Sequence, residues 1–404
     1  MAYELQDTSI TNARFKNKKI KSKSYSKTKK NILNKKQQHK QSLIQSSTKS
    51  SKNASNNKNS LTLNNLVHYK KIFQHNRKTD KTIILLKKLE FDIFYSCNRK
   101  YPFLVKETVT PLTGYTDPNE PPIDRRIITD PFREDDDIPT QYRHTLEDYE
   151  TIMAYGGSMG HNAAAGQHKT NMSVWSETFL LSNITPQEMV FNSGLWVLME
   201  NWCKQLGRNT NLKNITIFTG SIPDKNDKTI INHTNNHTNI IKMNIPLKMF
   251  KIICFQTIDK PNITHMEILI ADNKPYYVNP KFGKFDLNSY IVAHKSYNWF
   301  EQFSGINIKT LLEYYDFNTT NIKPFKYFIN MNVNLSPALR LLMKKSNWFG
   351  YLIYSPTIES LDAKWEECKA LEKEFQSIEF HKQYYEIVRN KLLNNKHSKF
   401  KLFG

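Results

Sequence analysis

The sequence lacks the residue patterns that would stabilise a small secreted protein or bind a structural zinc ion. Four cysteines occur in 404 residues, at positions 97, 203, 254 and 368, and no two form a Cys-x-x-Cys pair. This spacing excludes a disulfide framework and a cysteine-based zinc site, and it fits ordinary thiols in a reducing compartment. No window approaches the roughly 18 consecutive apolar residues of a membrane-spanning helix, so we expect no membrane span.

Apolar residues are also scarce, at 39% of the chain against roughly 45–50% in ordinary globular domains. The positive charge is concentrated at one end. Residues 1–79 hold 19 lysines or arginines and 2 acids, a net charge of +17, whereas the rest holds 39 basic and 35 acidic residues, a net charge of +4. We therefore expect a nearly neutral folded body with a strongly basic arm.

The arm, residues 1–82, consists mainly of Lys, Asn, Ser and Gln. Such a composition buries too little surface to offset the entropy of ordering, which predicts a disordered segment. The dense stretch at residues 16–36 could grip phosphates non-specifically or serve as a nuclear import signal; the alternative is a solvated tail. No apolar stretch follows the charges, so the arm does not resemble a secretory signal. An intracellular location is favoured over secretion, with mitochondrial, nuclear and viral-host compartments left open.

The remaining chain divides into a body, residues 83–310, and a C-terminal extension, residues 311–404. Residues 110–145 and 225–239 are rich in Pro, Asp, Asn or Thr and predict loops. Short apolar runs predict strands. These runs are residues 83–86, 91–95, 214–220, 250–255 and 266–271. Strands and helices alternate irregularly and without internal repeats, which favours an α+β fold over a parallel sheet.

In the extension, apolar residues recur at three- and four-residue steps from Leu361 to Leu392, after a helix start at Ser355-Pro356. The pattern predicts a long amphipathic helix, with Phe380 as the candidate position for a break. Its apolar face would pack on the body or, alternatively, mediate self-association into a homodimer.

A second amphipathic helix is predicted from Phe191 to Leu206, with an apolar arc of about 100°. Asn192, Glu200 and Lys204 share the flank beside that arc. An amide oxygen near a carboxylate suits Mg²⁺, which prefers oxygen ligands and retains several waters. Asn192 could instead be a helix cap. The apolar arc consists of Leu195, Leu198, Met199, Trp202 and Leu206.

Four histidines invite chemical interpretation. His161 precedes Asn162 and three alanines, and a histidine that faces a bound metal ion could take the proton from an attacking water. His233 and His237 have i,i+4 spacing but no nearby Cys or carboxylate, so zinc binding is disfavoured. His168 is interpreted as structural.

These motifs resemble the DNA/RNA non-specific endonucleases of the ββα-metal fold. Residues 158–165 match the family motif Asp-Arg-Gly-His followed by small residues, and residues 175–187 match its aromatic-Leu-Ser-Asn-Ile-x-Pro-Gln segment. Asn192 and Glu200 then fall at the family spacing. The resemblance implies a ββα-metal core with a mixed or antiparallel sheet, which cleaves DNA and RNA by contacting phosphates rather than base edges.

The resemblance also implies individual roles. His161 would be the general base and Asn192 the single protein ligand of Mg²⁺ or Mn²⁺. Glu200 would hold metal-bound water, and Asn183 would orient groups near the scissile phosphate. The residues implied in phosphate binding are Arg125, Arg133 and Lys204.

Two motif positions depart from the family. Ser158 replaces its Asp and Met159 replaces its Arg. Methionine cannot supply the planar donor fork of a guanidinium, and without that fork the rate could fall on the order of 10²–10³-fold. We therefore expect a weakened nuclease; the alternative is an inactive nucleic-acid-binding or packaging relative. Compensation would require another cation near Met159, with Lys169, Arg133 and Arg143 as candidates.

Overall fold

A computed structural model describes residues 72–73, 83–123, 131–153, 155–223, 229–234, 237–277, 284–285, 291–293, 297–325, 333–334 and 337–394. The predicted disordered arm, residues 1–82, lies outside the described residues except at Ile72 and Phe73. Both side chains are buried, and Ile72 O accepts a hydrogen bond from Asn307 N at 2.6 Å. At these two residues the chain packs into the body, ahead of the boundary expected from composition.

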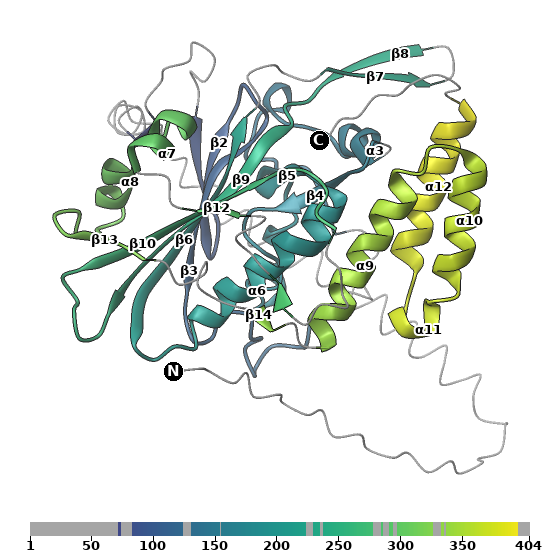
Figure 1. Cartoon of the computed structure of the whole chain (residues 1–404). Coiled ribbons are helices and arrows are strands. Elements are labelled where there is room, and N and C mark those ends of the chain that lie inside the picture. Colours follow the sequence, from purple (N-terminus) through teal and green to yellow (C-terminus); the bar gives the residue numbers. More distant parts are fainter. Residues whose placement is uncertain are drawn as a thin grey trace, which may run out of the picture. The chain divides into compact units, whose positions relative to one another are not determined.

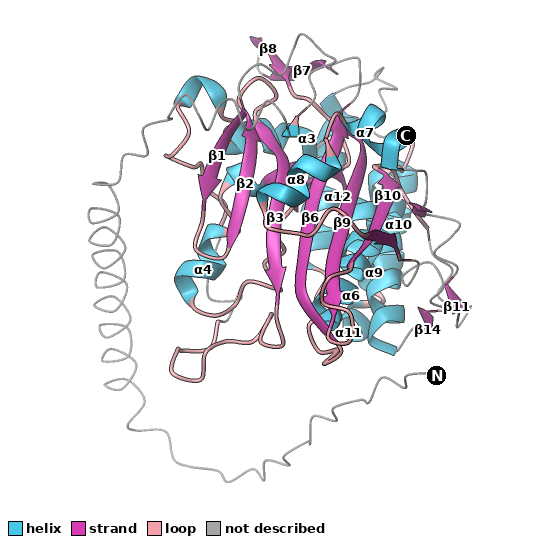
Figure 2. Cartoon of the chain, turned by 90° about the vertical axis from the view of Figure 1, so that its left-hand side faces the viewer, coloured by secondary structure: helices cyan, strands magenta, loops and turns pink. Residues whose placement is uncertain are grey.

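The centre of the body is a mixed sheet of eight strands in the order β1-β2-β3-β6-β9-β10-β12, with β13 beside β10 (Figure 2). All neighbours are antiparallel except β10 and β13. This confirms the predicted α+β class. The strands are β1 (Ile83–Lys87), β2 (Phe91–Ser96), β3 (Tyr101–Val109), β6 (Leu212–Pro223), β9 (Pro246–Thr257), β10 (Thr264–Asp272), β12 (Ile291–Ala293) and β13 (Ile322–Pro324).

The predicted strands at residues 83–86, 91–95, 250–255 and 266–271 are confirmed, and the strand predicted at 214–220 is longer than its apolar run. β6 and β9 both span twelve residues and pair over nearly their whole length, which adds polar residues to the apolar cores of both strands. Cross-strand pairing thus extends strands beyond what hydrophobicity alone predicts.

Helices cover both faces of the sheet (Figure 1). On one face, α7 (Tyr297–Ser304) and α8 (Ile308–Tyr314) bury their apolar residues against β3, β6, β9 and β10. On the other face lies a continuous helical run that contributes Leu195, Met199 and Trp202 to a second core cluster. This run consists of α5 (Met189–Phe191), the π-helical segment η4 (Asn192–Trp196) and α6 (Val197–Leu206).

Within residues 225–239, predicted as a loop, the described residues form strands. β7 (Thr229–Thr234) and β8 (His237–Lys242) form an antiparallel hairpin, with Thr229 opposite Lys242. Threonine and isoleucine, which favour strands, offset the asparagines that suggested a loop. The side chains of His233 and His237 lie outside the described residues. Two further short strands, β11 (Lys284–Phe285) and β14 (Val333–Asn334), also pair with each other.

The C-terminal block consists of α9 (Pro337–Ile353), α10 (Ile358–Lys369), α11 (Glu372–Phe375) and α12 (Glu379–Asn394). The long helix predicted here is broken in two places: the chain turns at Ala370, which was not predicted, and again at Gln376, which adopts φ +62° and lies close to the candidate break at Phe380. The apolar residues pack among these helices, and Tyr384 Oη donates to Gly157 O at 2.8 Å. The block therefore packs on the body, as the first alternative for its apolar face predicted.

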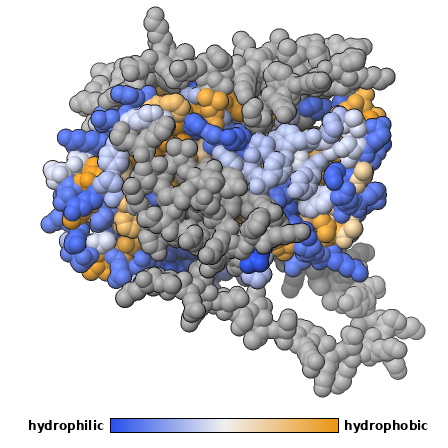
Figure 3. Space-filling view, viewed as in Figure 1, coloured by the Kyte–Doolittle hydropathy of each residue, from blue (hydrophilic) through white to orange (hydrophobic). Residues whose placement is uncertain are grey.

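The described surface is mixed in character. Figure 3 shows hydrophilic residues over much of the C-terminal block, with smaller apolar areas between them. Among the described residues, no helix is both long and apolar enough to cross a membrane.

Candidate active site

The motif that contains His161 forms a two-stranded hairpin beside the helical run. β4 (Gly157–His161) pairs antiparallel with β5 (Ile184–Glu188), which places Ser158 opposite Gln187 and His161 opposite Ile184. Successive strand residues point to opposite faces, so Ser158 and Gly160 share one face and Met159 and His161 share the other.

The helical run packs along β4 at two points. Asn192 Nδ2 lies 3.0 Å from Ser158 Oγ, and one turn later Trp196 Nε1 donates to His161 O at 3.2 Å. The apolar arc predicted for this helix is confirmed, since Leu195, Leu198, Met199, Trp202 and Leu206 are all buried. The buried arc orients the helix so that Asn192 lies against the hairpin.

Asn192 does not cap the helix. The cap is Glu188, whose Oε2 accepts a hydrogen bond from Phe191 N at 2.7 Å. Burial raises the pKa of Glu188 to about 7, against the hydrogen bonds from the first turn and from Tyr354 that lower it. Asn192 lies further along, at the start of η4, and π-helical segments of this kind occur often at functional sites. The side chain of Asn192 is therefore available for another role.

Ser158 fixes which atom of the Asn192 amide faces away from β4. Ser158 Oγ donates its single proton to Gln187 O at 3.0 Å, so it must accept from Asn192. The amide nitrogen of Asn192 thus faces Ser158, and its Oδ1 points elsewhere. Oδ1 is the atom that a hard cation would bind.

Gln187 ends the family segment matched at residues 175–187, but no role was predicted for it from the sequence. Its side chain is fully buried, and neither amide atom has a hydrogen-bond partner in the described structure. A Cβ on Gly160 would lie 2.2 Å from Gln187 Cδ, so only glycine fits beneath this side chain. Buried polar atoms without partners are rare, and they indicate a ligand, ion or water in many sites. Gln187 pairs with Ser158 across β4 and β5, and a prediction of this pairing could have identified Gln187.

The other face of β4 is apolar. Met159 packs with Phe132, Leu181 and Ile184 in a buried cluster. His161 as a residue is partly exposed, but its Nε2 is buried, and its ring contacts Phe132 and Phe179 with centroid distances of 5.5 and 4.9 Å. The position that carries arginine in the family motif is thus filled by a thioether among hydrocarbon side chains.

The described contacts of the nearby arginines lie elsewhere. Arg133 Nη1 donates to Ser176 O at 2.7 Å. Arg143 binds Glu134 and Asp136, each at 2.9 Å. These contacts bind both guanidinium groups to neighbouring segments of the chain. Arg125, the other arginine implied in phosphate binding, lies outside the described residues.

Asn183 is fully buried and makes three hydrogen bonds to main-chain atoms. Its Nδ2 donates to Ala163 O at 2.9 Å and Thr178 O at 2.8 Å, and its Oδ1 accepts from Ala163 N at 2.9 Å. The residue ties the turn after His161 to the segment before β5. Asn183 thereby holds the turn that follows His161.

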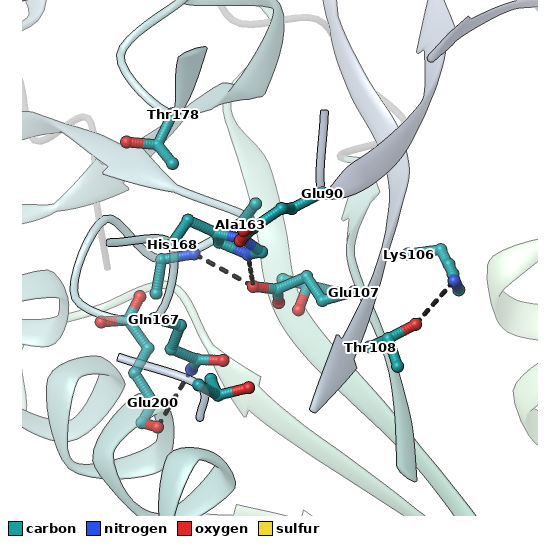
Figure 4. Close-up of polar contacts among 12 residues, drawn as sticks. Glu90, Lys106, Glu107, Thr108, Ala163, Gln167, His168, Thr178 and Glu200 are labelled. Carbon is teal, nitrogen blue, oxygen red and sulfur yellow. Dashed lines mark hydrogen bonds and ion pairs between the residues drawn. The ribbon is translucent and has the colours of Figure 1, made fainter. Parts of the chain in front are cut away.

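Glu200 lies on α6, where Gln167 Nε2 donates to its main-chain O at 3.1 Å (Figure 4). Burial raises its pKa to about 7; Lys251 lowers this pKa and Glu107 raises it. Lys251 is fully buried, with Nζ 2.8 Å from Thr219 Oγ1 and 4.6 Å from the ring of Trp196. Glu200 is therefore close to half-protonated at neutral pH.

His168 lies between two carboxylates. Its ring nitrogens lie 2.8 Å from Glu107 Oε1 and 3.0 Å from Glu90 Oε2, and Figure 4 shows the contact with Glu107. Burial lowers the pKa of His168, but the two carboxylates outweigh burial and raise it to about 9. These contacts support the structural interpretation of His168.

Lys204, one turn after Glu200, is partly buried near the C-terminal end of α6. Burial lowers its pKa, as do Arg208 and Lys169, whereas Tyr115 raises it. Lys204 therefore lies near other cations, on the same helical run as Asn192.

Among the described residues, no three His, Cys, Asp or Glu side chains gather into a group that could hold a metal ion. The donors at the hairpin are instead the amide oxygen of Asn192 and the amide of Gln187, which lacks a partner. Neutral oxygen donors of this kind fit magnesium, which prefers oxygen ligands.

Comparisons with known proteins agree with the motifs. Residues 68–314, more than half of the chain, match the family described as DNA/RNA non-specific endonuclease. Mouse mitochondrial nuclease EXOG is 26% identical over 181 residues, which cover 44% of this chain and 42% of that protein. Mitochondrial nuclease 1 of Schizosaccharomyces pombe is 28% identical over 203 residues, or 48% of this chain and 59% of that protein. The chain spans about half the length of these relatives.

One solved structure also matches. A chain from the crystal structure of an EndoG/EndoGI complex aligns with a TM-score of 0.45 and 20% identity, over 63% of this chain and 96% of that chain.

Proposed function

The chain belongs to the DNA/RNA non-specific endonuclease family, and from this premise we propose that it is a metal-dependent nuclease that hydrolyses phosphodiester bonds of DNA and RNA without sequence preference. The observation that carries the proposal is the orientation of Asn192. Ser158 holds the amide nitrogen, which turns Oδ1 away from β4 as a cation ligand.

In this proposal Asn192 Oδ1 would hold Mg²⁺ or Mn²⁺, and the amide of Gln187 would hydrogen-bond to water near that ion. Such an ion, when bound, neutralises phosphate charge and stabilises the departing oxygen. Glu200 keeps a water in position near the ion.

His161 is the proposed general base. It is the last residue of β4, and its ring contacts Phe132 and Phe179, which restrict its rotation. Asn183 holds the turn that follows it. A fixed imidazole takes a proton from water attacking phosphorus, and general-base catalysis of this kind contributes typically about 10²–10⁴-fold. Phosphate contacts come from Lys204 in this proposal, with Arg125 and Arg133 as further candidates.

The competing proposal is a relative that binds nucleic acid without cleaving it. The apolar surroundings of Met159 favour this alternative, because neither Arg133 nor Arg143 supplies a compensating cation through its described contacts. We expect a slow enzyme, since His161 and Asn192 are retained. An intracellular location is proposed, in agreement with the mitochondrial names of the relatives. Homodimer formation stays a prediction.

Nicking of supercoiled plasmid by the purified full chain tests the proposal. We expect slow nicking with Mg²⁺ that stops with EDTA, and a fall of about 10²-fold or more in His161→Gln. Gln fills most of the space that the imidazole occupies beside Phe132 and Phe179, so thermal unfolding should change little. Nicking that survives EDTA or the His161→Gln substitution would refute the proposed mechanism.

A further inference from the structure

Three cations and a tyrosine gather where the end of α6 meets the loop that follows β3. Lys204 and Arg208 come from α6 and the turn after it, Lys169 follows His168, and Tyr115 lies in the loop. The Arg208 guanidinium carbon is 5.1 Å from the centroid of the Tyr115 ring. Arg208 and Lys169 both contribute to the lowered pKa of Lys204, after burial. We refer to these four residues as the 115/208 cluster.

The cations of this cluster have no carboxylate partner within the described structure. None of the three takes part in an ion pair among those residues. Arg208 Nη1 donates to Lys204 O and Gln205 Oε1, both at 3.2 Å. The acid on the same loop, Asp117, instead accepts from the main chain and side chain of Asn119. Uncompensated like charges held together predict an anionic partner.

The loop that carries Tyr115 is held beside the cations by main-chain contacts. Gly114 adopts φ +83°, and its N donates to Gln167 O at 2.8 Å. A Cβ at Gly114 would lie 2.6 Å from Lys204 Cδ and 2.9 Å from Gly166 O, so the turn lies directly against Lys204. Tyr115 follows this turn and remains 53% exposed. The aromatic ring is therefore presented beside the cations without further ordering of the loop.

An exposed aromatic ring beside lysine and arginine has the chemistry of a single-stranded nucleic-acid site, where bases stack on rings and cations contact phosphates. Arg208 lies 5.1 Å from the centroid of the Tyr115 ring, and Tyr115 is 53% exposed, which leaves ring surface for an unpaired base. Helical rise places Lys204 about 18 Å from Asn192 along the run. A single strand would need several nucleotides to cover that separation.

We propose that the 115/208 cluster binds single-stranded DNA or RNA several nucleotides from the scissile bond, with Lys169, Lys204 and Arg208 on phosphates and Tyr115 stacked on a base. The inference rests on the proposed function for the identity of the ligand, but it concerns binding and requires neither the metal ion nor His161. It assigns roles to Tyr115, Arg208 and Lys169, and it places Lys204 away from the reacting phosphate.

Binding of a short fluorescein-labelled oligothymidine to the full chain in EDTA tests this proposal by anisotropy across a salt series. The basic arm is the same in every variant, so differences between variants report on the cluster. We expect Tyr115→Ala to weaken binding about tenfold and Tyr115→Phe to leave it within about twofold, because phenylalanine keeps the stacking face. Lys204→Met/Arg208→Met should lower the slope of log K against log salt by about 0.7 for each phosphate that the variant no longer binds.

The matched control is Lys369→Met/Lys373→Met, which removes the same charge from the distant C-terminal block. Equal weakening by the control, or full affinity in Tyr115→Ala, would overturn the proposal. Thermal unfolding of each variant checks folding. If binding depends on the cluster but the protein does not cleave, the binding proposal stands and the proposed nuclease activity is refuted. If the protein cleaves but binding does not depend on the cluster, the nuclease activity stands and the binding proposal is refuted.

Discussion

The two faces of β4 differ from the family motif in different ways. On one face, Ser158 stands where the motif has Asp, and its hydroxyl still accepts from Asn192 at 3.0 Å. On the other, Met159 stands where the motif has Arg, and it packs with Phe132 and Ile184. A hydroxyl can replace a carboxylate as an acceptor, whereas a thioether cannot replace a guanidinium as a cationic donor. The face that positions Asn192, the proposed metal ligand, thus keeps its acceptor, whereas the face proposed to contact phosphate has lost its cation.

Among substitutions on the two faces, a cation restored at position 159 should change the nicking rate most. We expect Met159→Arg to raise the rate of plasmid nicking about 10²-fold, because the guanidinium supplies two donors to a phosphate. It should also lower the free energy of unfolding by on the order of 1–2 kcal/mol, since a charge enters an apolar cluster. Initial nicking rates and thermal unfolding measure the two effects.

The matched variant is Met159→Lys. An ammonium supplies the charge without the planar fork, so its gain should be smaller than that of Met159→Arg. A folded Met159→Arg protein that cleaves no faster than the original chain would refute the role assigned to this face.

Removing the hydroxyl of Ser158 should weaken the preserved face. We expect Ser158→Ala to lower the nicking rate about tenfold, because Asn192 loses the partner that fixes its amide. Ser158→Thr keeps the hydroxyl and should retain most of the activity. The dependence of rate on Mg²⁺ concentration separates weaker metal binding from misfolding, and an unchanged dependence in Ser158→Ala would contradict the positioning role.

The smallest effect concerns Glu200, which lies on the same helix as Asn192. Its folded-state pKa, about 7, is above its ordinary value, so the folded state loses stability as pH rises through about 7. Glu200→Gln removes this loss. At pH 8 we expect a free energy of unfolding higher by on the order of 1 kcal/mol, and near pH 4.5 no difference from the original chain.

Urea unfolding at the two pH values measures this prediction. The same substitution should lower the nicking rate, since the carboxylate is proposed to hold water near the metal ion. Lower stability of Glu200→Gln at pH 8 would show that the carboxylate is favourably paired when charged.

The sequence predicted the elements whose signal is local. The buried arc of the helix from residue 191 to 206 follows from its periodicity, and four strands follow from short apolar runs. The hairpin of β7 and β8 was missed because asparagine-rich composition masked strand-forming Thr and Ile. The break of the predicted C-terminal helix at Ala370 and Gln376 depends on packing among α9, α10 and α12, which periodicity does not encode.

In the candidate site, too, some features were predicted from local sequence and others depend on contacts between distant segments. His161, Asn192 and Glu200 were identified by residue type and spacing, and their roles stay proposals. The direction of the Asn192 amide could not be predicted, because it depends on one proton of Ser158 donated across the β4–β5 pair. Glu188 as helix cap and the pairing of Tyr115 with Arg208 likewise depend on contacts between distant segments.

The most direct test compares Ser158→Asp and Met159→Arg in one plasmid-nicking assay with saturating Mg²⁺. The difference between the two faces predicts that Ser158→Asp stays within about threefold of the original chain, because the hydroxyl already performs the positioning task. Met159→Arg should cleave about 10²-fold faster, as expected for a restored phosphate contact. A large gain from Ser158→Asp together with none from Met159→Arg would contradict the account, since the defect would then lie on the metal-binding face.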